Sequence, residues 1–161
     1  MGELAAAHKE ILQNTGSLLA ERGHPQEAAE FCTRALELDP GYCRCRRNFA
    51  NVVLSAAIDD AKAISVAEAS LAELPPEADF LKALGQAYRR KGAFREACDA
   101  FVAAARLDPA DHDALRLAGE VVETDLKSPE KAKPLFAESL ARKPTQPDLI
   151  EKVRGHDPEP D

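Results

Sequence analysis

The chain of 161 residues has no tryptophan, one methionine and only 5% aromatic residues. Valine, isoleucine, tyrosine and phenylalanine, which favour β-strands, are scarce. Alanine, leucine, glutamate, lysine and arginine are abundant instead, and these residues favour helices. The composition therefore disfavours a sheet protein and predicts an all-α fold.

Long apolar runs are also missing. No stretch of 18 apolar residues occurs, which predicts that the chain does not span a membrane. The start, Met1-Gly2-Glu3-Leu4, lacks the basic and apolar regions of a secretory signal. We therefore expect a cytoplasmic protein, although a chain already trimmed of its signal would look the same.

Motifs that would indicate catalysis or a metal site are not found. G-x-S-x-G, H-E-x-x-H and a phosphate-binding glycine loop do not occur, and the four histidines are scattered. No C-x-x-C is present, and Cys32 and Cys98 are expected on the buried faces of helices. We predict no enzyme activity, no metal and no cofactor. A metal or redox role for Cys43 and Cys45 remains the alternative to ordinary reduced thiols.

One spacing recurs four times along the chain. An alanine precedes a proline by 12 residues in each of four pairs: Ala28/Pro40, Ala63/Pro75, Ala97/Pro109 and Ala132/Pro144. Successive prolines are 35, 34 and 35 residues apart, and each pair is preceded by a small residue, Gly16, Ala50, Gly85 or Gly119. From the small residue to the alanine the distance is 12, 13, 12 and 13 residues. Copies two and four should therefore hold one extra residue in the turn between their helices.

Each recurring position has a physical reason. A small residue midway along a first helix allows a second helix to approach it closely. The residue four positions after each alanine should fill the seam between the two helices, namely Cys32, Ala67, Phe101 and Phe136. Proline ends the second helix, and Gly23 and Gly92 should cap first helices in the left-handed conformation. Ser128 before Pro129, and Asp59 or Asp60, are candidate N-caps of second helices.

The third copy carries a known signature. Its residues follow the pattern W-x2-L-G-x2-Y…A-x3-F…P with leucine in place of tryptophan: Leu81, Leu84, Gly85, Tyr88, Ala97, Phe101 and Pro109. The chain thus resembles tetratricopeptide repeat (TPR) proteins over roughly residues 9–145. The resemblance implies an α-solenoid of four helix-turn-helix repeats at residues 9–42, 43–77, 78–111 and 112–146. Copy two is the most divergent.

The flanking segments complete a single predicted domain, residues 1–154. Residues 1–8 should extend the first helix, since Glu3-Leu4-Ala5-Ala6-Ala7 is a strong helix former. A short helix at 147–154 should cover the last repeat with Leu149, Ile150 and Val153, because a solenoid end otherwise exposes apolar surface. Residues 155–161 are expected to be a disordered acidic tail.

The resemblance also implies a binding surface, because first helices line the concave side of TPR solenoids. Residues 43–56 and 78–91 each have a net charge of +3, whereas the whole chain has −7. Arginine binds carboxylates through two parallel hydrogen bonds, and asparagine and glutamine can hold a peptide backbone. We therefore predict a basic, amide-rich surface for an acidic peptide, formed by Arg44, Arg47, Asn48, Asn51, Lys82, Gln86, Arg89 and Arg116. The alternative is that these side chains are only a solvated helix surface.

The preferred function is a protein–protein interaction module, such as a scaffold, adaptor or co-chaperone. The carboxylate clamp of chaperone-binding TPR domains fits poorly, since in one register only Asn48 matches and in the next only Arg47 and Asn51 match. A self-associating TPR assembly protein is the main alternative, and a homo-oligomer is possible on that basis. RNA binding is disfavoured by a pI near 5.2 and the lack of interleaved aromatics, so no nucleic-acid partner is expected.

Overall fold

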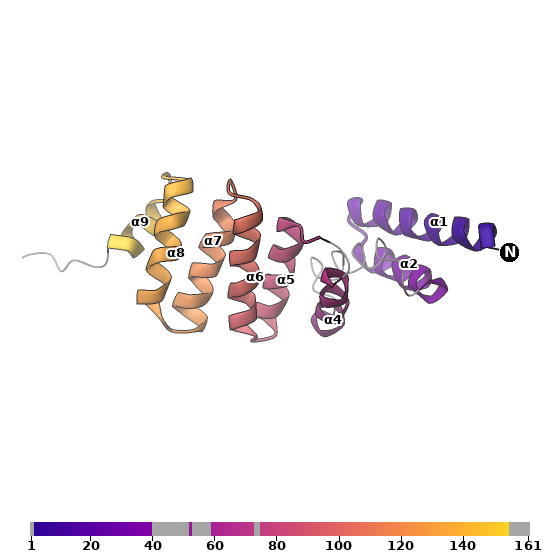
Figure 1. Cartoon of the computed structure of the whole chain (residues 1–161), viewed down its shortest axis with the longest axis horizontal. Helices are drawn as coiled ribbons and strands as arrows, with labels where there is room; N and C mark the ends of the chain where they lie inside the picture. The colour runs from indigo at the N-terminus through magenta and orange to yellow at the C-terminus, as the bar shows by residue number, and fades with distance from the viewer. Residues whose placement is uncertain (1, 40–51, 53–58, 73–74, 155–161) are drawn as a thin grey trace, which may run out of the picture. The chain divides into compact units, whose positions relative to one another are not determined.

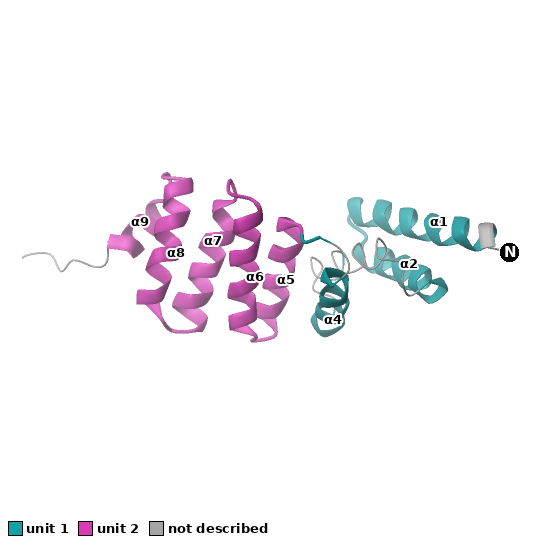
Figure 2. Ribbon diagram, in the orientation of Figure 1, with its two compact units in different colours: residues 1–76 teal, residues 77–161 magenta. Residues whose placement is uncertain are grey.

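The computed structural model describes residues 2–39, 52, 59–72 and 75–154, and these residues form helices joined by short turns, with no strand among them (Figure 1). The all-α fold class is confirmed. The chain divides into two compact units, Met1–Pro76 and Glu77–Asp161 (Figure 2), which we describe separately. The division falls between the second and third predicted repeats. Within the described ranges, no helix combines the length and apolar character that crossing a membrane requires.

The first unit begins with a helical hairpin of α1 (Gly2–Glu21) and α2 (Pro25–Leu38). Gly23 joins them with a φ of 82°, so the predicted left-handed cap is confirmed. The N–H of His24 donates to Leu19 O at 2.9 Å, which completes the cap. Helix α4 (Asp60–Leu71) follows in the same unit, and Asp59 caps it by accepting from the N–H of Lys62. Most of the predicted first helix of copy two lies outside the described residues.

The second unit stacks its helices in chain order. These are α5 (Ala78–Arg90), α6 (Phe94–Leu107), α7 (His112–Glu120), α8 (Pro129–Arg142) and α9 (Pro147–Arg154), and each packs against the next (Figure 1). Gly92 has a φ of 78° between α5 and α6, as predicted. Two apolar clusters hold the unit together, one around Phe101 and one around Phe136.

The small residues of the first helices do allow close packing. A Cβ on Gly85 would lie 2.8 Å from the ring of Phe101, and one on Gly119 would lie 2.4 Å from the ring of Phe136. In copy one, a Cβ on Gly16 would meet Cys32 Sγ at 2.9 Å. Each glycine therefore faces the predicted seam residue of its own repeat, and that prediction is confirmed for copies one, three and four.

The extra residue of copy four is not in the turn, where the spacing placed it. Helix α7 ends instead in a π-helical turn, η1 (Val121–Asp125), and the N–H of Leu126 donates to Val121 O five residues back. A π turn holds one residue more than an α turn, so it absorbs the insertion inside the helix. Lys127 then takes the left-handed position with a φ of 52°, where copies one and three have glycine.

The C-terminal end of the second unit is capped by α9. Leu149 is 1% exposed and packs with Val122, Ala132 and Phe136, and Val153 lies at the edge of this cluster. The predicted capping helix is therefore confirmed, with Leu149 and Val153 in the cluster, although Ile150, also predicted to cover it, is not among the cluster residues. Ser128 is the N-cap residue of α8, as predicted, but its hydroxyl donates to Leu126 O and does not accept from the helix. Pro129 does occupy the start of α8, and the tail at 155–161 lies outside the described residues.

Candidate partner-binding surface

Four of the eight predicted contact residues lie within the described part of the chain. Lys82, Gln86 and Arg89 are on α5, at a spacing that places them along one helix face, and Arg116 is on α7. The other four, Arg44, Arg47, Asn48 and Asn51, lie outside the described residues.

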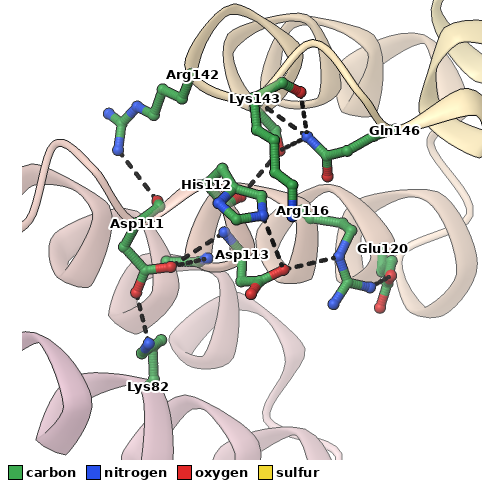
Figure 3. Close-up of polar contacts among 11 residues, drawn as sticks. Lys82, Asp111, His112, Asp113, Arg116, Glu120, Arg142, Lys143 and Gln146 are labelled. Carbon is green, nitrogen blue, oxygen red and sulfur yellow. Dashed lines mark hydrogen bonds and ion pairs between the residues drawn. The ribbon is translucent and has the colours of Figure 1, made fainter.

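Lys82 joins α5 to the start of α7. Its Nζ lies 2.5 Å from Asp111 Oδ2 (Figure 3) and 3.1 Å from Asp79 Oδ1. Asp111 is also the N-cap of α7, because its other oxygen accepts from the N–H groups of Asp113 and Ala114. One carboxylate thus fixes the helix start and holds the lysine of the preceding repeat.

The contact between Lys82 and Asp111 raises the pKa of the amine and lowers the pKa of the carboxyl. The hydrogen bond to Asp111 raises the pKa of Lys82, although burial of the amine opposes the shift. Burial favours the neutral form of Asp111, but the hydrogen bonds from Lys82 and from the N–H of Ala114 outweigh it and lower the pKa of that carboxyl. Both groups are therefore charged across the physiological range.

Arg89 and Arg116 are linked through Glu120. Arg116 Nη1 lies 2.5 Å from Glu120 Oε1, and Arg89 Nη1 lies 3.8 Å from Glu120 Oε2 (the Arg116 contact is drawn in Figure 3). Arg89 Nε also donates to Asp125 Oδ2 at 2.7 Å, and Arg116 Nε donates to Asp113 Oδ1 at 3.3 Å. Because these bonds connect α5 to α7 and η1, the cations of two consecutive repeats lie on one surface, which is formed by α5, α7 and η1. We call this surface the wall.

The wall continues to the capping helix. Lys152 of α9 forms an ion pair with Glu123 of η1, and its Nζ lies 5.1 Å from the centre of the Phe136 ring. We call the whole set the charge ladder, and it contains four cations and six carboxylates, Lys82, Arg89, Arg116 and Lys152 with Asp79, Asp111, Asp113, Glu120, Glu123 and Asp125.

The carboxylates of the charge ladder offset the positive charge that was predicted for this surface. Counting charges along residues 78–91 gave +3, but two of the four cations, Lys82 and Arg89, pair with carboxylates at the start of α7, in α7 and in η1. In the described part of the wall, Lys82, Arg89 and Arg116 are therefore ion-paired. A count made along one helix omits charges contributed by its neighbour in space.

Two residues that matter here were missed from the sequence. Asp111 had an available signal, since an aspartate immediately before a helix with apolar periodicity is a typical N-cap. The sequence holds no such signal for Asp125, because this residue reaches Arg89 from the π turn, which the spacing did not predict. Gln86 is half-buried.

Two of the four cysteines lie within the described residues. Cys32 is buried and Cys98 is half-buried. Burial, together with the charge of Asp99, raises the pKa of Cys98, which keeps it protonated. Among residues 2–39, 52, 59–72 and 75–154, no group of three or more His, Cys, Asp or Glu is placed to hold a metal ion. Cys43 and Cys45 lie outside these ranges.

Comparison with known proteins agrees with this geometry. The family model for the tetratricopeptide repeat matches residues 9–42 and 78–111, which are the predicted bounds of copies one and three. The helix pairs, their close glycine contacts and these matches identify the chain as a tetratricopeptide repeat protein. A comparison with curated protein sequences gave no significant match.

Solved TPR structures have the same fold. One is YrrB, described as a TPR protein with an unusual peptide-binding site, which is 20% identical over 88% of this chain and 72% of its own, with a TM-score of 0.74. Another is MamA, 19% identical over 95% of this chain and 80% of its own, with a TM-score of 0.79. At these identities the likeness shows the fold alone.

Proposed function

We propose that this protein is an interaction module that holds a segment of a partner protein along its first helices. The observation that carries the proposal is the shared wall of α5 and α7, where Lys82 pairs with the N-cap residue of α7 and Glu120 links Arg89 to Arg116. The TPR fold is a protein-interaction fold, and one protein of similar fold is described as having a peptide-binding site. Scaffold, adaptor and co-chaperone roles all use such a wall.

The ligand that fits best is an acidic segment, and the wall offers it two cations. The carboxylate of Asp79 beside Lys82 is 96% exposed, and that of Asp113 beside Arg116 is 52% exposed. Exposed pairs of this kind contribute about 0–1 kcal/mol, so a ligand carboxylate can replace them at little cost. Asp111 and Asp125 are more buried and keep their cations in position.

Gln86 of α5 adds an amide to the proposed site. Gln86 can donate to and accept from an extended peptide backbone. Arg44, Arg47, Asn48 and Asn51 remain contact residues predicted from the sequence alone, since they lie outside the described residues. An acidic peptide would then contact at least two consecutive repeats.

Peptide binding can be measured with two matched double variants. The probe is a labelled peptide library that ranges from aspartate- and glutamate-rich to lysine-rich, and the readout is fluorescence anisotropy. Lys82→Glu with Arg116→Glu should weaken acidic peptides at least tenfold. Asp79→Asn with Asp113→Asn removes the weak internal competitors and should strengthen the same peptides severalfold.

Circular dichroism of both variants checks that the helices are retained. A preference for lysine-rich peptides, or equal affinity in the wild type and the Lys82/Arg116 variant, would reject the acidic-ligand proposal. Loss of acidic-peptide binding in the charge-reversed variant alone, with intact helicity, would support it.

A further inference from the structure

Helix α1 has a second apolar face besides the one that packs on α2. Leu12 is 5% exposed and Gly16 contacts α2, so these residues mark the inner face. On the outer side, Leu4 is 80% exposed, Ile11 is 62% exposed and Leu18 is 51% exposed. These three residues are seven apart, which places them in one stripe along the helix. We call this stripe the outer face of α1.

The same positions are covered elsewhere in the protein. Relative to the small residues Gly16 and Gly119, Ile11 corresponds to Ala114, and Leu18 corresponds to Val121. Both Ala114 and Val121 are 0% exposed, and Val121 packs with Phe101 of α6, the second helix of the preceding repeat. The outer face of α1 therefore has the position that a neighbouring helix covers in copy four.

Head-to-tail stacking of two chains would need a free second helix at the other end. That end is closed, because α9 covers the last repeat and buries Leu149 against Phe136 and Ala132. A contact between two identical faces remains, and a contact of this kind closes on itself as a dimer. The stripe suits it, since Leu4 and Leu18 are placed symmetrically about Ile11.

We propose that the outer face of α1 docks on the outer face of α1 in a second copy, antiparallel about a two-fold axis at Ile11. Ile11 then meets Ile11 of the second copy, and Leu4 meets Leu18 of the second copy. Ala7, Asn14 and Thr15 beside the stripe are uncharged, and the remaining neighbour is His8. The two-fold axis at Ile11 places the two His8 side chains on opposite sides of Ile11, so they do not face each other at the centre. The dimer is held by burial of the apolar side chains.

Sedimentation velocity of the whole chain across protein concentrations tests the proposal. We expect a concentration-dependent dimer of the wild type, and at least a tenfold higher dissociation constant for Ile11→Glu, because two carboxylates would be buried together. Leu107→Glu is the matched control, since Leu107 is 47% exposed but lies at the end of α6, and its dimer should be unchanged. Circular dichroism checks the helicity of each variant.

A mixing experiment then tests the two-fold axis. Ile11→Lys and Ile11→Glu should each be monomeric, and an equimolar mixture should form a heterodimer, because the two-fold places lysine opposite glutamate. A wild type that stays monomeric, or a dimer that Ile11→Glu leaves intact, would overturn the proposal. Variants that are monomeric alone and remain so when mixed would overturn the axis at Ile11.

Discussion

Asp111 combines two roles that substitution can separate. Its carboxylate caps α7 by accepting from two backbone N–H groups, and it also pairs with Lys82 of the preceding repeat. Asparagine is as good an N-cap as aspartate but carries no charge, whereas alanine can do neither. The Asn and Ala variants therefore measure the ion pair and the cap separately.

We expect Asp111→Ala to lower the free energy of unfolding by about 1–2 kcal/mol, mostly through the lost cap. Asp111→Asn should cost less than about 1 kcal/mol, because it loses only a partly exposed ion pair. The difference in the free energy of unfolding between the wild type and Asp111→Asn should depend on pH. The pKa of Asp111 is lowered, so its stabilising effect is present above the unfolded value of about 4 and is lost as pH falls through the folded pKa.

At the alkaline side, the raised pKa of Lys82 means that its contribution is complete below about pH 10 and is lost as pH rises through the folded value. Because Asp111 loses its charge in acid, the free energies of unfolding of the wild type and Asp111→Asn should converge as the pH falls. Urea unfolding between pH 2 and pH 7 measures this. A gap between the two that stays constant over this range would show that the Lys82 contact does not stabilise the fold.

Lys127 occupies a backbone conformation that glycine adopts more easily. Its φ of 52° corresponds to the glycine caps Gly23 and Gly92, which have φ values of 82° and 78°. A side chain in this region costs about 1–2 kcal/mol, partly offset by the greater chain entropy that glycine loses on folding. Lys127→Gly should therefore stabilise the protein by about 0.5–1 kcal/mol in urea unfolding. Gly92→Lys is the reciprocal control and should destabilise it, and stabilisation by both substitutions would contradict the explanation.

At the scale of a helix pair, stability depends on the glycine–aromatic contact. A Cβ on Gly85 would lie 2.8–3.0 Å from three ring atoms of Phe101, which is 0% exposed and cannot move without disturbing its cluster. Gly85→Ala should therefore cost about 1–3 kcal/mol through overpacking, and Gly85→Leu at least as much. In a Phe101→Leu background the cost of Gly85→Ala should fall, because the smaller side chain leaves room. Additive effects in this double-mutant cycle would rule out the steric explanation.

Local rules explain why these elements could be predicted. The glycine, the seam residue and the closing proline each act within one hairpin, so their spacing along the chain is enough to predict their contact. The π turn could not be predicted in this way. Spacing showed that copy four holds an extra residue, but a turn and a widened last helical turn accommodate it equally well. Packing of Val121 and Val122 into two clusters favours the π turn, and that is a property of the folded unit.

At the scale of the whole molecule, the repeat bounds were predictable and the charge balance of the wall was not. The period of the repeats fixes which helices are neighbours, and two predicted ranges coincide with the family matches. Besides Asp79 of its own helix, Lys82 pairs with Asp111 at the start of α7, and Arg89 pairs with Asp125, whose position depends on the π turn. Electrostatic pairing between repeats thus needs coordinates, whereas apolar packing within a repeat needs only its pattern.

The two apolar clusters of the second unit predict that it folds without the first. The clusters around Phe101 and Phe136 are built from its own helices, and α9 covers its C-terminal end. A fragment of residues 77–154 should therefore be helical by circular dichroism and unfold in one cooperative transition. Leu149→Ala in this fragment should cost about 2–4 kcal/mol, because Leu149 is 1% exposed and packs against Phe136. Ile150→Ala is the neighbouring control on the same helix, and its effect should be smaller since that side chain is only half-buried. A fragment without cooperative unfolding would mean that residues 1–76 are required for the core, and the two units would then be one folding domain.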